Sequence, residues 1–217
     1  MVFRGGTALN KLFINPPSRY SEDIDFVQKS ADPIDQTIDA IRKVLEPWLG
    51  DPKWKITQRS AKLIYKYESI NKSASKLKIE INTTEHFQVL PLKTVPISLD
   101  SDWFTGTADI ITYELDELMA TKLRALYQRR KWRDLFDIWY VATKKLANLN
   151  KVFNIFAKYC TYNGIKISRD EFIKNLEQKK DNRDFRIDMS LLLPSKLHWN
   201  FEEAYQFVLD NVISKLP

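Results

Sequence analysis

Two neighbouring motifs set the architecture of this chain: Arg4-Gly5-Gly6-Thr7-Ala8-Leu9-Asn10-Lys11 and then Arg19-Tyr20-Ser21-Glu22-Asp23-Ile24-Asp25-Phe26. The first indicates a strand over 2–4 that enters a glycine pair and then a short helix over 8–13, with Thr7 as its cap. Polar and apolar residues alternate over 23–27, which is typical of a half-buried strand. A glycine turn before a helix exposes backbone N–H groups that can hold a phosphate. This turn is not a P-loop, because it lacks the spacing and the Gly-Lys-Ser/Thr ending.

The second motif carries two acids. Asp23 and Asp25 are two residues apart on the predicted strand, so both carboxylates point to one face while Ile24 and Phe26 point to the core. Adjacent carboxylates repel each other unless a cation lies between them, and oxygen ligands of this kind suit Mg²⁺, which also binds substrate phosphates. The two motifs together favour a phosphate-binding turn that faces a metal-binding strand. An isolated Asp-x-Asp pair is also typical of an ordinary surface strand.

A third carboxylate lies on the alternating stretch from Leu77 to Asn82. Its apolar residues face one way, and Glu80 faces the other. If this strand lies beside the one that carries the aspartates, Glu80 would complete a carboxylate cluster that helps to bind a second ion or to accept the nucleophile's proton. The alternative is an exposed strand glutamate paired with a lysine.

The sequence pattern changes after Tyr113. Before it, apolar spacing predicts a helix over 33–49 and β-strands over 54–58, 63–67, 77–81 and 94–97. After it, the pattern predicts helices over 115–127, 135–147, 152–159, 171–178 and 201–213. We therefore expect an α+β chain with one domain over 1–113 and a helical domain over 114–217.

The composition indicates a folded protein and excludes several classes. Apolar residues make up 44% of the chain and charged residues 29%, which is unlike a disordered tail. No run approaches the length of a membrane helix, and the start does not resemble a signal peptide. A single cysteine, Cys160, excludes an internal disulfide and, with only two histidines, argues against a zinc site. We expect a cytoplasmic protein without a membrane partner.

Basic residues are unevenly placed along the chain, whose net charge is +6. The stretch from Lys53 to Lys78 holds a run of lysines and arginines against Glu68 alone, with aromatic residues between them at Trp54, Tyr65 and Tyr67. Such a stretch can neutralise phosphates and stack on bases. It can also be a solvated sheet edge on which lysines prevent aggregation. The sequence leaves both interpretations open.

The predicted helix over 115–127 and the one after it carry further charges. Lys122 follows the apolar stripe of the first helix, so its ammonium would either extend to solvent or point into a cleft toward an anion. By spacing alone, Asp134 would cap the next helix, and Asp137 would be a first-turn acid favoured by the helix dipole.

Taken together, these residues resemble a known family. The glycine motif followed by Arg-Tyr-Ser-Glu-Asp-Ile-Asp-Phe, with Lys122-Leu123-x-Ala125-Leu126 and Arg133-Asp134-Leu135-Phe136-Asp137-Ile138 behind it, is similar to the AbiEii/AbiGii-type nucleotidyltransferases. These are toxins of type IV toxin–antitoxin and abortive-infection systems within the DNA polymerase β-like superfamily. The resemblance implies a polymerase β-like core with a mixed sheet, followed by a C-terminal helical bundle. Members usually carry a helical stretch before the glycine motif, which here begins four residues from Met1.

The resemblance also implies roles for the matched positions. The implied catalytic residues are Asp23, Asp25, Glu80, Lys122 and Asp134, with Asp23 and Asp25 as the metal ligands. The implied nucleotide-binding residues are Gly5, Gly6, Thr7, Lys11 and Asp137, with Thr7 in place of the family's serine. Glu80 is matched by its strand context alone.

The implied reaction is the Mg²⁺-dependent transfer of a nucleoside monophosphate from a nucleoside triphosphate to an acceptor hydroxyl. In the family, the acceptor known for some members is the 3′ end of tRNA, and a separately encoded antitoxin is an implied partner. Two alternatives stay open. The same core would modify a protein or a small molecule, or the chain would be a non-catalytic nucleic-acid-binding protein with a decayed site.

Overall fold

The computed structural model describes residues 1–102, 104–182, 192–194, 197 and 199–216. The chain divides into two compact units, neither of which is one continuous stretch of sequence. Unit 1 consists of Met1–Leu12, Ser21–Gln88 and Leu92–Tyr113, and unit 2 consists of Phe13–Tyr20, Val89–Pro91 and Glu114–Pro217. The predicted partition into domains 1–113 and 114–217 stays a prediction.

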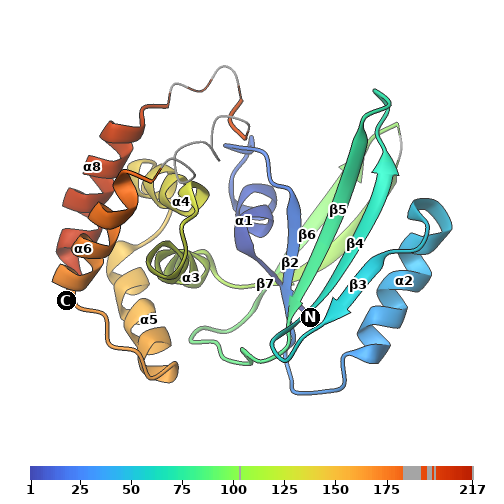
Figure 1. The fold of residues 1–217 in the computed structure, drawn as a ribbon, viewed down its shortest axis with the longest axis horizontal. Coiled ribbons are helices and arrows are strands. Elements are labelled where there is room, and N and C mark those ends of the chain that lie inside the picture. The colour runs from blue at the N-terminus through green and yellow to red at the C-terminus, as the bar shows by residue number, and fades with distance from the viewer. Residues whose placement is uncertain (103, 183–191, 195–196, 198, 217) are drawn as a thin grey trace. The chain divides into compact units, whose positions relative to one another are not determined.

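Within the described part of unit 1, seven strands form one mixed sheet in the order β3-β4-β5-β2-β1-β7-β6 (Figure 1). The strands are β1 (Val2–Arg4), β2 (Asp23–Val27), β3 (Lys53–Ile56), β4 (Ser60–Glu68), β5 (Ala74–Asn82), β6 (Lys93–Asp100) and β7 (Thr105–Thr112). The neighbours β1–β7 and β2–β5 are parallel, and the others are antiparallel. The short strand β1 therefore lies in the interior of the sheet.

One face of β4 and β5 packs against α2 (Asp35–Leu49), which Figure 1 shows alongside these strands. The helix forms because its apolar residues recur at helical spacing, and it confirms the prediction over 33–49. Buried residues of the two strands and the helix form a core of Ile38, Ala61, Leu63, Tyr65, Ile79 and Ile81. Since side chains alternate along a strand, the residues between these positions point to the opposite face of the sheet.

The glycine pair begins a helix earlier than predicted. Helix α1 (Gly5–Ala8) starts directly after β1 and continues as a π-helical segment, η1 (Leu9–Phe13). The prediction that Thr7 caps this helix is wrong, because the chain already turns at Gly5, whose φ is +80°. Figure 1 shows α1 beside β2 on the side of the sheet away from α2.

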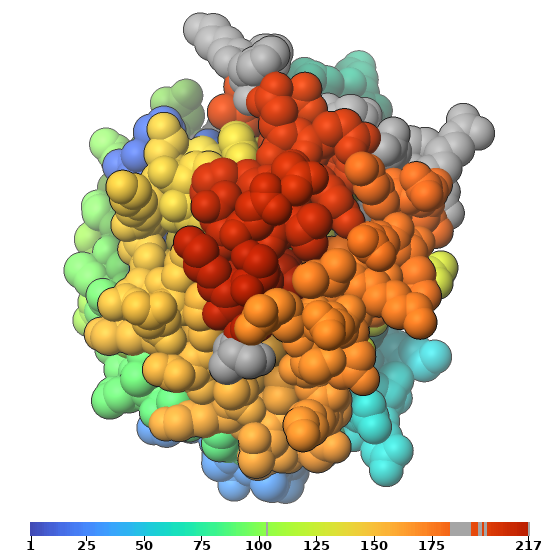
Figure 2. Space-filling model, turned by 90° about the vertical axis from the view of Figure 1, so that its left-hand side faces the viewer, coloured from blue at the N-terminus to red at the C-terminus, as the bar shows by residue number. Residues whose placement is uncertain are grey.

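Unit 2 is helical, which confirms the expected C-terminal helices. Its elements are α3 (Leu115–Gln128), α4 (Trp132–Thr143), α5 (Leu149–Tyr162), α6 (Arg169–Lys180), α8 (Phe201–Asn211) and the 3₁₀ turn η2 (Ile213–Lys215). Figure 2 shows α5, α6 and α8 covering one face of this unit. The ring centroid of Phe201 lies 3.6 Å from that of Trp132, and Tyr205 is buried, so these aromatic rings pack within unit 2.

The segment Val89–Pro91 groups with unit 2 because of one buried acid. The carboxylate of Glu117 on α3 accepts hydrogen bonds from the N–H groups of Val89 and Leu90, each at 2.7 Å. The hydroxyl of Tyr159 on α5 donates to the same carboxylate at 2.8 Å. Glu117 therefore holds a loop and two helices together.

Strand β7 and helix α4 also differ from the predictions. Strand β7 falls in a segment where the sequence indicated no structure, because its largely polar residues are mostly exposed and show no half-buried alternation. Helix α4 begins at Trp132, three residues before the predicted start. Across the described residues, none of the helices has the length and apolarity that a membrane span requires.

Candidate active site

The parallel pairing of β2 with β5 brings the predicted acids together. In this register Asp23 lies opposite Lys78, and Asp25 lies opposite Glu80. The expectation that the Glu80 strand lies beside the aspartate strand is therefore confirmed. Because Ile79 belongs to the core against α2, these charged residues all point to the other face of the sheet.

Lysines from two strands neutralise part of this cluster. The Nζ atom of Lys78 lies 2.8 Å from Oδ2 of Asp23 and 3.4 Å from Oε2 of Glu80. The Nζ atom of Lys62 lies 2.9 Å from Oε1 of Glu80. Glu80 is therefore paired with lysines, and the part predicted for it beside the aspartates stays a prediction.

The electrostatics of Lys78 report the charge of this face. Burial alone would lower the pKa of Lys78, but the hydrogen bond and the charge of Asp23, followed by those of Glu80, raise this pKa above its ordinary value. A carboxylate that holds a cation in this way has a local field suited to positive charge. The face therefore already binds one cationic group at Asp23.

The glycine turn lies directly against the second aspartate. A Cβ atom on Gly5 would lie 3.0 Å from the Cβ of Asp25 and closer still to one of its carboxylate oxygens. The positive φ of Gly5 and this close approach both require a residue without a side chain. Arg4, opposite Asp25 in β1, donates to Glu85 at 2.7 Å. Burial would lower the pKa of Arg4, but the pairing with Glu85 raises it.

A hydrogen bond ties the turn to the strand. The hydroxyl of Thr7 donates to the backbone carbonyl of Asp23. A hydroxyl has one proton, so Thr7 cannot also donate to a phosphate while it makes this bond. The remaining donors for a phosphate are the backbone N–H groups at the start of α1, where the side chain of Arg4 makes no capping hydrogen bond. Further along, Asn10 Nδ2 donates to the carbonyl of Gly6 at 3.1 Å, and Lys11 is exposed on η1.

The donor set fits a magnesium ion. Among the described residues there is no group of three or more His, Cys, Asp or Glu side chains arranged to hold a metal. Mg²⁺ does not need one, because it usually binds one or two carboxylates and completes its coordination with water and substrate phosphates. Asp23 and Asp25 offer two carboxylates on one face, beside a turn that opens a helix and whose first backbone N–H groups can bind a phosphate.

A second charged cluster lies inside unit 2. The Nζ atom of Lys122 lies 3.1 Å from Oδ1 of Asp134 and 2.8 Å from Oδ2 of Asp137. The guanidinium of Arg19 binds both oxygens of Asp137, at 2.7 Å and 2.8 Å. Arg129 binds both oxygens of Asp134, at 2.7 Å and 3.0 Å. Five charged groups from three segments therefore satisfy one another.

The interpretations based on helical spacing are wrong for this cluster. The N-cap of α4 is Lys131, and Asp134 lies in the first turn with its side chain fully buried. Asp137 lies one turn further along, also fully buried, and the ammonium of Lys122 does not reach solvent. Tertiary packing has overridden capping, because the carboxylates turn inward to basic partners.

The two aspartates stay ionised despite their burial. Burial raises the pKa of Asp134, but the charges and hydrogen bonds of Lys122 and Arg129 outweigh it and lower the pKa to about 2. Burial likewise raises the pKa of Asp137, and Lys122 and Arg19 lower it below the ordinary value. The cluster therefore contains two buried carboxylates that remain negative at neutral pH.

The sequence predicted no individual contact for four residues of these clusters: Arg19, Lys62, Lys78 and Arg129. The position of Lys78 had a signal, since it shares a strand face with Glu80. Arg19 had none, because it lies in a loop whose partner, Asp137, is remote in sequence.

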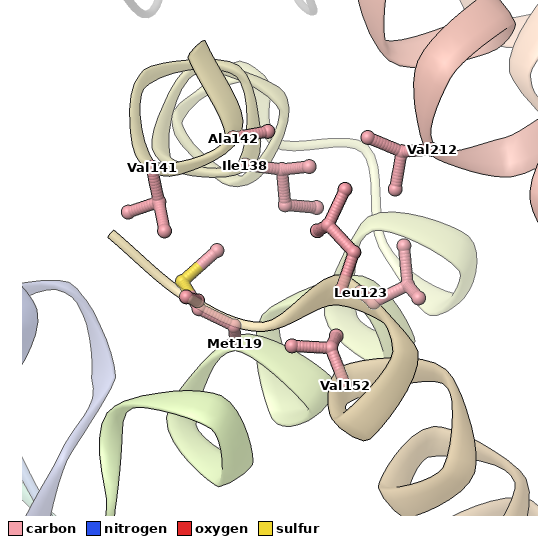
Figure 3. Close-up of a pocket in the computed structure, with 9 residues that line it drawn as sticks. Met119, Leu123, Ile138, Val141, Ala142, Val152 and Val212 are labelled. Carbon is pink, nitrogen blue, oxygen red and sulfur yellow. The ribbon is translucent and has the colours of Figure 1, made fainter. Parts of the chain in front are cut away.

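A small cavity in unit 2 is not part of either cluster. It lies among the helices α3, α4 and α5 and is lined by aliphatic side chains that include Met119, Leu123, Ile138, Val141 and Val152 (Figure 3). The space open to the centre of a water-sized molecule is about 10 Å³. An apolar space of that size offers no polar partner to a ligand and is a packing defect.

Comparison with known proteins supports a specific fold and family. A family model described as the nucleotidyl transferase AbiEii toxin of type IV toxin–antitoxin systems matches residues 1–207. A search of curated proteins found no match. Among solved structures, the nucleotidyltransferase toxin MenT4 from Mycobacterium tuberculosis H37Rv is similar, with a TM-score of 0.63 and 15% sequence identity. The alignment covers 100% of this chain and 76% of that one, so the predicted α+β nucleotidyltransferase fold is confirmed.

Proposed function

This chain belongs to the AbiEii nucleotidyltransferase toxin family of type IV toxin–antitoxin systems, and from that premise we propose a specific reaction. It transfers a nucleoside monophosphate from a nucleoside triphosphate to the hydroxyl at the 3′ end of tRNA, in a Mg²⁺-dependent step. The observation that carries the proposal is the packing of Gly5 against Asp25, with Thr7 bonded to the backbone of Asp23. This arrangement supports the proposal because it sets the glycine turn, which would bind phosphate, beside two carboxylates.

Asp23 and Asp25 are the residues that would hold Mg²⁺. When bound, the ion supplies positive charge that neutralises the triphosphate and the attacking oxygen. Lys78, which now pairs with Asp23, is the group whose position would have to adjust.

The chain's own groups would do the rest by positioning and charge stabilisation. Backbone N–H groups from Gly5 to Thr7 would bind the terminal phosphates, with Lys11 following on the same helical segment. The acceptor oxygen would form a bond to the α-phosphorus as the bond to the β-phosphate oxygen breaks and pyrophosphate leaves. Glu80 would accept the proton of the acceptor hydroxyl.

For the buried cluster we propose a positioning role. Lys122, Asp134 and Asp137 are buried and bonded to one another and to two arginines, so a substrate would have to displace these partners to reach them. They would hold α3 and α4 in register. The direct catalytic part that the family resemblance implies for Lys122 and Asp134, and the nucleotide contact it implies for Asp137, stay predictions beside this positioning role.

The proposed partners follow from the same premise. A cognate antitoxin would neutralise the toxin, and the cytoplasm, which supplies nucleoside triphosphates and tRNA, would be its place of action.

The test is incubation of the purified protein with each α-labelled nucleoside triphosphate, Mg²⁺ and a cell extract containing total RNA. We expect label at the 3′ end of tRNA, with loss of labelling in Asp23→Ala and Asp25→Ala and in the presence of a chelator. Asp39→Ala, which removes an exposed aspartate of α2, is the matched control and should label normally.

Each other outcome identifies the part that fails. Label on a protein or a small molecule would overturn the tRNA acceptor and leave the transfer chemistry. Labelling by Asp23→Ala at the normal rate would overturn the metal site.

A further inference from the structure

The sheet register divides the lysines of the basic stretch 53–78 into edge and interior positions. Strand β3 pairs with β4 over 61–64, and β2 pairs with β5 over 78–82. Lys66 on β4 and Lys76 on β5 lie beyond these registers, at strand edges that no further described strand covers. The two lysines of β3 lie on the edge strand itself. Protection against edge-to-edge pairing therefore accounts for these four lysines.

Lys78 is an interior position with a paired strand on each side. It lies opposite Ile64 of β4 and opposite Asp23 of β2. Its Nζ atom lies 2.8 Å from Oδ2 of Asp23 and 3.4 Å from Oε2 of Glu80, so one ammonium neutralises carboxylates from two neighbouring strands. Edge protection does not explain a charge at this place, whereas the acids of the candidate active site do.

The ammonium of Lys78 and the glycine turn approach the aspartates from opposite sides. Figure 1 shows β2 between α1 and β5. Gly5 lies against Asp25 from the side of α1, and Lys78 reaches Asp23 from the side of β5. Lysine has a flexible four-carbon stem. A ligand that bridges the turn and the aspartates would therefore lie within a short side-chain movement of Lys78.

The charge balance of this face changes sign when a divalent cation binds. Asp23, Asp25 and Glu80 carry three negative charges against the two positive charges of Lys62 and Lys78, an excess of one negative charge. Two added positive charges turn it into an excess of one positive charge. Positive charges a few Å apart repel each other. A triphosphate supplies the negative charge that restores the balance and gives the displaced ammonium a new partner.

We infer that Lys78 is a built-in cation of the metal site, which binds Asp23 in the free protein and moves to the triphosphate when metal and nucleotide bind together. The inference rests on the proposed function for the metal and the nucleotide. Because Lys78 serves both ligands in turn, each ligand binds more weakly alone than in the presence of the other, and this coupling is reciprocal.

The experiment measures the two ligands separately on the purified protein. Binding of Mn²⁺, a paramagnetic substitute for Mg²⁺, is followed by electron paramagnetic resonance without nucleotide. Binding of inorganic tripolyphosphate at saturating Mg²⁺ is followed by isothermal titration calorimetry, and it needs neither a base nor an acceptor. The test variant is Lys78→Gln. The matched control is Lys76→Gln, which removes the same charge from an exposed position two residues earlier on the same face of β5.

The two affinities should move in opposite directions in Lys78→Gln. We expect Mn²⁺ to bind about two- to five-fold more tightly, because it no longer displaces a partly exposed ion pair. Tripolyphosphate should bind about ten-fold more weakly, because one hydrogen bond to a charged group is lost. Lys76→Gln should change both affinities by less. An ion pair with a structural role alone would not produce opposite changes.

Two further variants locate the effect. Lys78→Arg keeps the positive charge, so it should bind Mn²⁺ as weakly as the unmodified protein and retain most of the tripolyphosphate binding. Asp23→Ala added to Lys78→Gln should remove the gain in Mn²⁺ affinity, because the gain arises at Asp23. The urea midpoint of Lys78→Gln should stay close to that of the unmodified protein, since the pair is partly exposed.

The outcomes separate this inference from the proposed function. Mn²⁺ binding that is no tighter in Lys78→Gln than in Lys76→Gln would overturn the inference, and so would tripolyphosphate binding that does not depend on Lys78. Label on tRNA with neither change in affinity would overturn the inference alone. Both changes in affinity, with no label transferred to any acceptor, would overturn the proposed function alone.

Discussion

The two units each contain a network of alternating charges, and the networks differ in their burial. On the sheet of unit 1, the charged side chains of Asp23, Lys62, Lys78 and Glu80 keep between 21% and 38% of their surface exposed. In unit 2, those of Arg19, Lys122, Asp134 and Asp137 keep between 0% and 3%. Water can replace a partner throughout the first network, whereas in the second it reaches Arg129, whose side chain is 51% exposed, but not the other four residues. The open network is suited to exchanging ions with substrates, and the closed one to holding helices in place.

The sharpest test of this contrast is a matched pair of substitutions. Asp137→Asn leaves Arg19 and Lys122 with one carboxylate fewer inside unit 2, which should lower the free energy of unfolding by about 3–5 kcal/mol. Asp25→Asn removes the same charge from the open face. It should change the free energy of unfolding by less than about 1 kcal/mol and should abolish nucleotide transfer. Urea unfolding and the labelling assay measure the two effects. Equal destabilisation by both substitutions would remove the distinction.

Strong acid should remove the stabilisation that Asp134 gives the closed network. The folded pKa of Asp134 is about 2, below an unfolded value of about 3.9. Its stabilisation is therefore fully present above about pH 4 and is lost as the pH falls through 2. The loss should reach roughly 2 kcal/mol and be absent from Asp134→Asn. Urea midpoints measured over this pH range test it, and parallel pH profiles for the two proteins would contradict it.

The glycine turn should be the next most sensitive position. Gly5→Ala places a methyl group against Asp25 at a positive φ, which should cost about 1–2 kcal/mol from the backbone alone. The methyl group would displace the carboxylate of Asp25, which is a proposed metal ligand. The rate of nucleotide transfer should therefore fall by more than the loss of stability alone would cause. Gly50→Ala is a control, since Gly50 also has a positive φ but an added Cβ meets nothing within 4 Å. Similar transfer rates for the two variants would argue against the role of the close approach.

The smallest effect is expected for an open ion pair. Lys62→Gln removes the 2.9 Å contact between Lys62 and Glu80. The side chain of Lys62 is 38% exposed and that of Glu80 is 29% exposed. The free energy of unfolding should fall by less than about 1 kcal/mol at low salt, and the difference should vanish at about 1 M salt. Thermal unfolding at the two salt concentrations checks this. A larger effect that persists in salt would mean that the open network is as rigid as the closed one.

Local pattern was sufficient for much of the fold and for the centre of the candidate site. The alternation around Asp23 and Asp25 predicted a strand with both acids on one face, and the apolar spacing over 33–49 predicted α2. These features depend on residues close in sequence, where side-chain periodicity is a direct signal.

Features that depend on contacts between residues far apart in the chain could not be predicted from local sequence patterns. The pairing of Asp25 with Glu80 was only conditional on two strands being neighbours. Asp134 had the spacing of a cap, yet its carboxylate is drawn inward by Lys122 and Arg129. No local pattern shows that Arg19 will be buried against Asp137, because the bond joins a loop to a helix far along the chain.

The interleaved path of the chain limits how the protein can be dissected. A gene fragment that ends at Tyr113 would encode Phe13–Tyr20 and Val89–Pro91 without the helices they pack with. Arg19 would then lack Asp137, and the amides of Val89 and Leu90 would lack Glu117. Split expression at that point would yield two incomplete pieces, so activity should return only when both are produced together and fold around each other.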